Sequence, residues 1–125
     1  MNSTAPIPSA VTLPDPADTF EVSVADTRAL LDSPLKPILI DCREEDEHAY
    51  CRIPGAQLLP LAAINSRIAG VLGSKETPAI IYCHHGMRSM RAVTYLRDHG
   101  FSHVFSMRGG IDAWSSEIDP TVPVY

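Results

Sequence analysis

Hydrophobic and polar positions along the chain follow two different periods. Short apolar runs such as Ile38–Ile40 and Ala79–Tyr82 are typical of strands that are covered on both faces. Between such runs, apolar residues recur every three or four positions, as in helices that pack one face against a sheet. The alternation predicts an α/β domain with a mostly parallel sheet flanked by helices. In chain order we predict strand 20–22, helix 24–31, strand 38–40, helix 44–50, strand 57–59, helix 61–71, strand 79–82, helix 90–99, strand 104–106 and helix 111–118.

The first 18 residues differ in composition from the rest of the chain. Pro6, Pro8, Pro14 and Pro16 lie there among small and polar residues, which predicts a flexible leader over 1–18. A Pro-rich docking segment is disfavoured, because no PxxP with flanking basic residues is present. The remaining residues, 19–125, suit one compact domain with a single core.

The net charge and the cysteine content indicate which partners and which cellular compartment suit this protein. The formal net charge of −5 argues against nucleic acid as a partner. No apolar run approaches the roughly 20 residues of a membrane helix, and the first basic residue, Arg28, comes too late for a signal peptide. The three cysteines show no CxxC spacing, which favours a reduced intracellular protein. We therefore expect a cytoplasmic protein that has no cofactor and no membrane contact.

The segment 83–89 carries the most specific chemistry. Cys83 directly follows the apolar run Ala79–Tyr82 and faces the start of the next predicted helix. Loop N–H groups and the positive end of a helix dipole favour negative charge there, and they commonly lower the cysteine pKa from about 8.5 to below about 7.5. Asp41 follows strand 38–40, and because carboxyl ends of parallel strands meet at one edge, we expect Asp41 and Cys83 to be neighbours.

Four elements in this order resemble the motifs of rhodanese-like domains. Residues 40–44 resemble the family's IDxRE element, 52–56 its HIPGA element, 83–89 its active-site loop and 109–114 its closing GGxxAW element. The resemblance covers roughly Thr19 to Trp114. Two positions depart from the pattern, because Arg52 stands where the family often has histidine and Cys51 where it often has glycine.

The resemblance implies a three-layer α/β fold over 19–125 and a sulfurtransferase activity. Cys83 would take a sulfane sulfur from a small anion such as thiosulfate, or from a persulfide or polysulfide donor. The Cys83 persulfide would then pass the sulfur to an acceptor, which is cyanide, a thiol or a partner protein.

The rest of the loop is a predicted substrate-binding segment whose N–H groups converge on the anion. Arg88 offers a planar fork for an oxyanion, with a structural ion pair as the alternative. Ser89 either donates its hydroxyl to the anion or caps the next helix. No metal is expected, because adjacent side chains on a tight loop do not readily chelate one ion. The predicted substrate-binding residues are His84, His85, Gly86 for its backbone, Met87 as an apolar lip, Arg88 and Ser89.

Four residues near this loop have structural interpretations. Asp41 and Arg43 form a natural ion pair that holds loops together near the site. Cys42 has the position of a small buried residue in the core. Cys51 is either a bystander, which we favour, or a resolving thiol for an oxidised or persulfidated Cys83.

Two other functions compete with sulfur transfer. Cysteine phosphatases of the same fold use a Cys-x5-Arg loop, whereas only four residues separate Cys83 from Arg88 here, so the cradle is too short for phosphate. A non-catalytic binding module or a sulfur carrier stays open as the second function. Inactive rhodanese-like domains usually lack the loop cysteine, and this chain keeps it.

Overall fold

A five-stranded, wholly parallel sheet forms the middle layer of the protein. The computed structural model describes residues 11–125. The strand order is β1-β5-β4-β2-β3, and each neighbouring pair runs parallel. The mostly parallel sheet predicted from the sequence is therefore confirmed. The strands are β1 (Glu21–Val22), β2 (Ile38–Asp41), β3 (Gln57–Leu58), β4 (Ala79–Tyr82) and β5 (Val104–Met107).

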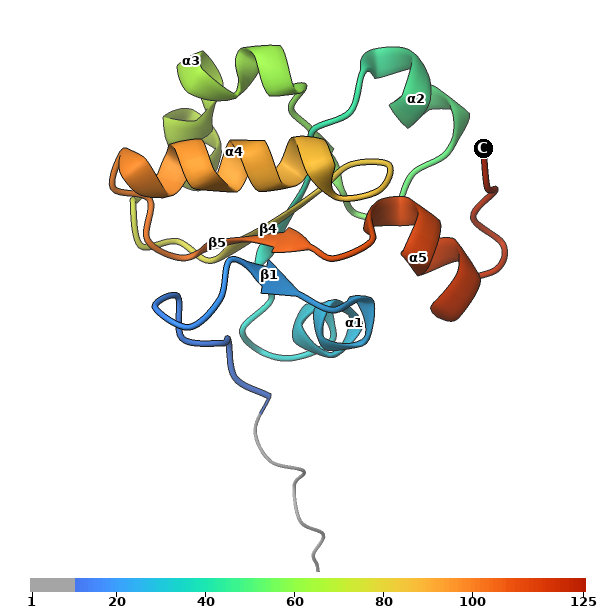
Figure 1. Ribbon diagram of the computed structural model, residues 1–125, viewed down its shortest axis with the longest axis horizontal. Coiled ribbons are helices and arrows are strands. Elements are labelled where there is room, and N and C mark those ends of the chain that lie inside the picture. The colour runs from blue at the N-terminus through green and yellow to red at the C-terminus, as the bar shows by residue number, and fades with distance from the viewer. Residues whose placement is uncertain (1–10) are drawn as a thin grey trace, which may run out of the picture.

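Helices cover both faces of this sheet and complete the predicted three layers. α3 and α4 lie on one face, while α1 and α5 pack together on the other (Figure 1). α2 buries none of its residues and follows the carboxyl end of β2. The helices are α1 (Val24–Leu31), α2 (Glu45–Tyr50), α3 (Leu61–Leu72), α4 (Met87–Asp98) and α5 (Gly110–Glu117).

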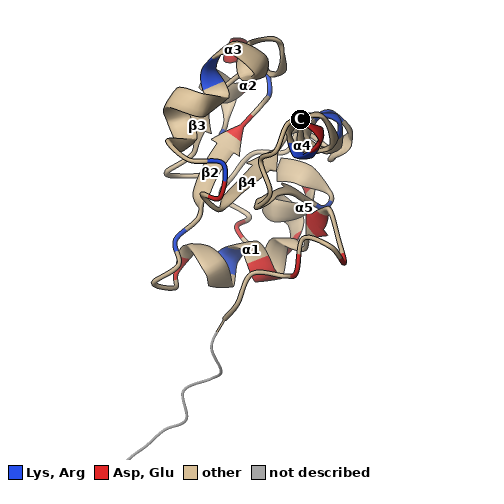
Figure 2. Cartoon of the chain, turned by 90° about the vertical axis from the view of Figure 1, so that its left-hand side faces the viewer, with Lys and Arg blue, Asp and Glu red and all other residues tan. Residues whose placement is uncertain are grey.

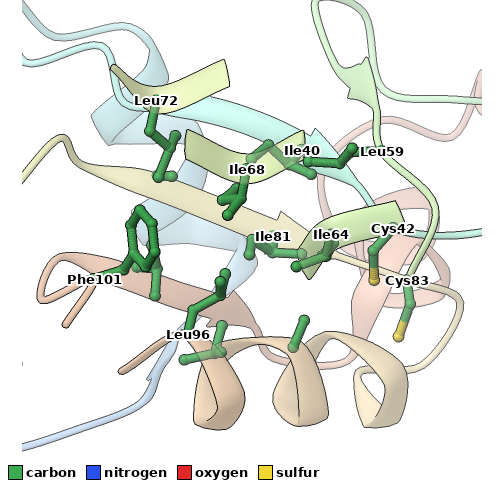
Figure 3. Close-up of a cluster of buried hydrophobic side chains, with 14 residues drawn as sticks. Ile40, Cys42, Leu59, Ile64, Ile68, Leu72, Ile81, Cys83, Leu96 and Phe101 are labelled. Atoms are coloured by element: carbon green, nitrogen blue, oxygen red, sulfur yellow. The ribbon is translucent and has the colours of Figure 1, made fainter. Parts of the chain in front are cut away.

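The strand alternation divides the core into two clusters. Ile40 and Ile81 pack with α3 and α4, as Figure 3 shows, and Leu39 and Ile80 pack with α1 and α5. Each isoleucine is fully or almost fully buried, which contributes roughly 1.5–3 kcal/mol per side chain before entropy is counted. Two clusters explain why the strands are continuous apolar runs, since neither face meets water.

The start of α4 differs from the sequence prediction. The helix begins at Met87 instead of residue 90, and Gly86 is its N-cap with φ of +107°. A glycine adopts this left-handed backbone without a Cβ penalty, so the chain turns into the helix immediately after the strand. The interpretation of Ser89 as the N-cap is therefore wrong, because Ser89 lies inside the first turn.

Part of the predicted leader lies against the domain. Pro6 and Pro8 fall outside the described residues, but Leu13 packs against the cluster beneath α1 and α5. The Arg97 guanidinium donates to the carbonyl oxygen of Pro16 at 2.7 Å. The division between a leader and a domain at residue 18 stays a prediction.

The surface carries charges of both signs. Acidic and basic residues alternate on α1, for example (Figure 2), where Arg28 and Asp32 form an exposed ion pair at 3.3 Å. Such exposed pairs contribute little to stability. Within residues 11–125, no helix combines the length and the apolar character needed to cross a bilayer.

The first turn of α5 holds the loop that follows β4. The N–H groups of Ile111 and Asp112 donate to the carbonyl oxygens of Cys83 and His84 at 2.9 and 3.1 Å. Gly110 has φ of +62°, and a Cβ there would lie only 2.3 Å from the carbonyl oxygen of His84. The backbones approach so closely that this position requires glycine.

We predict that Gly110→Ala lowers the free energy of unfolding by at least about 2 kcal/mol, because it combines a left-handed backbone with a steric clash. Urea denaturation measures this change. The matched control is Gly70→Ala in α3, where nothing lies within 4 Å of the added Cβ. That substitution is expected to stabilise the helix by up to about 1 kcal/mol. Equal effects of the two substitutions would contradict the role given to Gly110.

Candidate active site

The sulfur of Cys83 lies where β4 ends and the loop to α4 begins. The residue is 1% exposed. The N–H groups of Gly86 and Ser89 donate to its Sγ at 3.1 and 3.4 Å, and the Ser89 Oγ lies 3.6 Å away. α4 also points its N-terminus at this sulfur, which favours negative charge. The surroundings are those of an anion site.

A second sulfur lies beside the first. Cys42 and Cys83 follow the paired residues Asp41 and Tyr82 on neighbouring parallel strands, and the Cys42 N–H donates to the Tyr82 carbonyl oxygen at 2.9 Å. Figure 3 shows the two sulfur atoms at the same end of the core cluster. Cys42 is thus a core residue, as predicted, and it is also a direct neighbour of Cys83.

These contacts make Cys83 a thiolate at neutral pH. The neighbouring Cys42 thiol has the largest effect, and together with the Ser89 hydroxyl and the two N–H groups it outweighs burial and lowers the pKa of Cys83 to about 4. The neighbouring Cys83 sulfur, with burial, raises the pKa of Cys42 far above its ordinary value. The pair therefore consists of one thiolate and one thiol.

The Ser89 hydroxyl is held in place from the sheet. Ser89 is fully buried, its Oγ donates to the Gly86 carbonyl oxygen at 3.2 Å, and it lies 2.7 Å from the Ser106 Oγ on β5. Ser106 therefore belongs to the support of the site. Sequence reasoning missed it, because a serine within a strand carries no local signal of its partner.

Arg88 is engaged in an ion pair with α2. Its two terminal nitrogens lie 2.7 and 3.0 Å from the carboxylate oxygens of Glu47. This hydrogen-bonded pairing is the main reason that the pKa of Glu47 falls to about 2. The structural alternative considered for Arg88 is thus present. A guanidinium has five N–H donors, so donors remain for a substrate, and the role of Arg88 as an anion ligand stays a prediction.

The Asp41–Arg43 ion pair is present in the buried interior. The Arg43 Nε and Nη2 donate to the two oxygens of Asp41 at 2.9 and 2.7 Å, and both side chains are fully buried. Burial by itself would raise the pKa of Asp41, but hydrogen bonds from Arg43 and His48 outweigh it and lower the pKa. A doubly hydrogen-bonded pair of this kind ties the end of β2 to the chain that follows it.

Tyr125 connects this pair to the Arg88 pair. Its hydroxyl accepts from Arg43 Nη1 at 2.9 Å and donates to Glu47 Oε2 at 2.7 Å. The network therefore runs from Asp41 through Arg43, Tyr125 and Glu47 to Arg88. No local pattern predicts Glu47 or Tyr125 at this site, because Glu47 is 41 residues from Arg88 and Tyr125 is 82 residues from Arg43.

The two loop histidines stack instead of facing apart. The His84 ring stacks on His85 and on Tyr125, with a centroid distance of 3.9 Å in each case. The His84 Nε2 is buried without a hydrogen-bond partner, whereas the His85 side chain is 60% exposed. His84 thus shapes the rim of the site, and its contact with substrate stays a prediction.

One group of possible metal ligands exists within the described part of the chain. His84, His85 and Asp112 place one ligand atom each within 4.8 Å of one another. The two imidazole planes are stacked at 28°, so their nitrogen lone pairs do not converge on one point. The geometry favours stacking over chelation, and the expectation that no metal binds stays a prediction.

Two further residues singled out in the sequence are Cys51 and Met87. Cys51 packs with Ile53 and Tyr82 in the cluster on the opposite face of the sheet, which favours the bystander interpretation over a resolving thiol. Met87 is 80% exposed at the first position of α4. Its role as an apolar lip stays a prediction.

A surface groove of about 760 Å³ lies on the face of the sheet covered by α1 and α5. Arg28, Ile38 and Trp114 are among its lining residues, and no residue of the loop 83–89 contributes to it. The groove is thus separate from the thiolate.

Comparison with known families decides the identity of the domain. The sequence model of the rhodanese-like domain matches residues 23–117. The chain belongs to the rhodanese-like domain family. The match includes β2, the loop 83–89 and the first turn of α5, which are the elements that build the thiolate site.

Named relatives of this rhodanese-like domain are sulfurtransferases. Thiosulfate sulfurtransferase GlpE of Pseudoalteromonas translucida is 38% identical over 97 residues, covering 76% of this chain and 88% of GlpE. Probable adenylyltransferase/sulfurtransferase MoeZ of Mycobacterium tuberculosis is 35% identical over 104 residues, covering 83% of this chain. The chain spans only 26% of the length of MoeZ.

A solved structure agrees with the fold. The crystal structure of thiosulfate sulfurtransferase from Pseudomonas aeruginosa superimposes with a TM-score of 0.73 at 27% identity. The superposition covers 80% of this chain and 19% of that one. The expected rhodanese fold is therefore confirmed.

We predict that the thiolate absorbance of this rhodanese-like domain rises with pH through a midpoint near 4 and stays flat up to neutral pH, because the pKa of Cys83 is about 4. A far-ultraviolet titration measures it, with Cys83→Ser as the blank. Cys42→Ala is expected to raise the midpoint, since it removes the thiol that lowers the pKa of Cys83 most, and Cys51→Ala is expected to leave it unchanged. A midpoint near the ordinary value of about 8.5 would contradict the assignment.

Proposed function

We propose that Cys83 is the sulfur-carrying nucleophile of a sulfurtransferase that uses thiosulfate or a related sulfane donor. The strongest support is the surroundings of the Cys83 sulfur, which accepts hydrogen bonds from the backbone N–H groups of Gly86 and Ser89 at 3.1 and 3.4 Å. Thiosulfate is the natural first donor to test, because the relative GlpE is named for it.

The first half-reaction loads the enzyme. The Cys83 thiolate attacks the outer sulfur of thiosulfate, a new S–S bond forms, and the old S–S bond breaks with its electron pair leaving on sulfite. Cys83 then carries a persulfide. The low pKa of Cys83 supplies the thiolate at neutral pH without a separate general base.

The second half-reaction unloads it. Cyanide or an acceptor thiolate attacks the outer sulfur, and the bond to Cys83 breaks with its electron pair returning to Cys83. A thiol with a low pKa is a good leaving group. The hydrogen bonds that stabilise the resting thiolate therefore also favour its release, which is the electrostatic preorganisation that catalysis requires.

Arg88 is the candidate ligand for the sulfonate oxygens of thiosulfate. It is half-buried in the first turn of α4, and its ion pair with Glu47 fixes the guanidinium. A fixed guanidinium binds an oxyanion with less loss of side-chain entropy than a free one. The Arg88–Glu47 pair has no net charge, so the N–H donors of Arg88 that Glu47 leaves free are the groups that would bind the oxygens of the donor.

The test of the proposed function is intact-protein mass spectrometry after incubation with thiosulfate. Directly after loading, we predict a gain of the mass of one sulfur atom, which is lost when cyanide is added. Cys83→Ser is expected to show no gain, whereas Cys51→Ser is expected to gain normally, because Cys51 lies on the other face of the sheet. Sulfur transfer by Cys83→Ser at the wild-type rate would rule out the mechanism.

A second prediction concerns Arg88. Arg88→Ala is expected to reduce kcat/KM for thiosulfate by about tenfold or more, the loss of one charge-assisted hydrogen bond, and to affect a neutral organic trisulfide less. Steady-state kinetics with both donors measure this. Arg91→Ala, which removes an exposed arginine from the same helix, is the control.

The Glu47 carboxylate left unpaired by Arg88→Ala could itself repel thiosulfate, so the double variant with Glu47→Gln separates the two effects. If Arg88 binds thiosulfate directly, the double variant stays impaired. Full recovery in the double variant, or equal losses for both donors, would contradict a direct role.

A further inference from the structure

Cys42 and Cys83 form a buried pair of sulfurs that the transfer reaction alone does not require. They are 0% and 1% exposed, and both lie in the cluster covered by α3 and α4 (Figure 3). A sulfurtransferase needs only one sulfur carrier. The second thiol is placed against the reacting atom, where an aliphatic side chain would fill the core equally well.

The strand pairing places these two residues at the separation of a disulfide. Asp41 is paired with Tyr82, and the next residue on each parallel strand is a cysteine. Neighbouring strands lie about 4.7–4.9 Å apart, and disulfides join Cα atoms about 4.4–6.8 Å apart. Both side chains also point to the same face of the sheet. A bond between the sulfurs therefore needs no strand to shift register.

We propose that Cys42 is the resolving thiol of the Cys83 persulfide and converts it to a Cys42–Cys83 disulfide with release of hydrosulfide. This inference rests on the proposed function, since it begins from the persulfide. It adds a second outcome for the bound sulfur, which is release as sulfide when no acceptor arrives.

The step balances without an external oxidant. Cys42 Sγ attacks Cys83 Sγ, a bond forms between them, and the bond from Cys83 Sγ to the outer sulfur breaks. The electron pair of that bond leaves on the outer sulfur, which takes the Cys42 proton and departs as hydrosulfide. The outer sulfur is reduced and Cys42 Sγ is oxidised, while Cys83 Sγ keeps the oxidation state that it reached on loading. An added dithiol reduces the disulfide again.

The directions of approach suit this displacement. The N–H groups of Gly86 and Ser89 reach the Cys83 sulfur from the loop, whereas Cys42 reaches it from the core. An outer sulfur carrying negative charge is favoured on the loop side, beside the N–H donors. Attack by Cys42 from the core side then requires the outer sulfur to leave toward the loop.

Loading the sulfur also changes the state of Cys42. In the resting enzyme its proton is held by the Cys83 thiolate, which is the main reason for its raised pKa. In the persulfide the negative charge has moved to the outer sulfur. The Cys42 proton is then bound less tightly, so Cys42 is a better nucleophile than it is in the resting enzyme. The order of events is therefore built into the pair, because Cys42 reacts after Cys83 has been loaded.

The test loads the full chain with thiosulfate, removes excess donor, and then follows sulfide release and intact mass without any added thiol or cyanide. We expect about one equivalent of sulfide per chain, with a protein product lighter than the reduced form by two hydrogens. Peptide mapping should place the disulfide between Cys42 and Cys83. Dithiothreitol should restore the reduced mass, and the release rate should not depend on protein concentration.

Variants separate the resolving role from the hydrogen bond. Cys42→Ser keeps a hydroxyl donor beside Cys83 but cannot form a disulfide, so it should still be loaded and release sulfide at least about tenfold more slowly. Cys51→Ser is the matched control and should behave as the wild type does. The disulfide mapped in the wild type tests the proposal even if Cys42→Ser fails to fold.

The outcomes that overturn the proposal are distinct. A wild-type persulfide that persists without sulfide release would refute the resolving role and leave the proposed function intact. Sulfide release by a folded Cys42→Ser at the wild-type rate would also refute it. Absence of a persulfide on Cys83 in a folded Cys42→Ser, together with absence of a Cys42–Cys83 disulfide in the wild type, with thiosulfate and with inorganic polysulfide, would overturn the proposed function, and this inference with it.

Discussion

The architecture of the site follows from one constraint, which is that a negatively charged sulfur is buried in the core. Cys83 is only 1% exposed, so water cannot stabilise its charge, and the protein must supply the donors. The abrupt turn at Gly86 brings the start of α4 close enough for two N–H groups to reach the sulfur. The glycine at 110 lets α5 hold the loop carbonyls from the other side, which keeps the donors in position.

The strand alternation separates this anion from a second charged network. On β2 and the residue after it, Asp41 turns toward Tyr82 and Arg43, while Cys42 turns toward the α3 and α4 cluster. Asp41 is fully ion-paired and hydrogen-bonded, as a buried carboxylate must be to remain charged. One strand end therefore contributes a structural carboxylate to one face and a buried thiol to the other. The network extends through Tyr125 to the Arg88–Glu47 pair. Hydrogen bonds therefore connect the buried Asp41–Arg43 pair with the partly exposed arginine of the loop.

The sequence predicted the elements well because their signals are local. The bounds of α1 and β4 were predicted to the residue, and the loop cysteine was placed correctly at the end of β4. The start of α4 was predicted three residues late, because Arg88 and Ser89 have the polarity of a loop and the capping glycine was assigned to it. The partners of Arg88 and Ser89 were missed, since Glu47 and Ser106 are 41 and 17 residues away from them.

The sequence did not reveal how the other two cysteines lie relative to Cys83. Cys51 attracted attention because it departs from the family pattern, yet it packs on the far face of the sheet. Cys42 was interpreted as a small core residue, yet the register between β2 and β4 places it next to Cys83. Register follows from packing across the whole sheet, which no local pattern reveals. In the reaction that we propose, an acceptor that arrives from solvent competes for the loaded sulfur with a thiol that is already in place. The rate of the second route would be set by the fold alone, so the concentration of acceptor would decide which product forms.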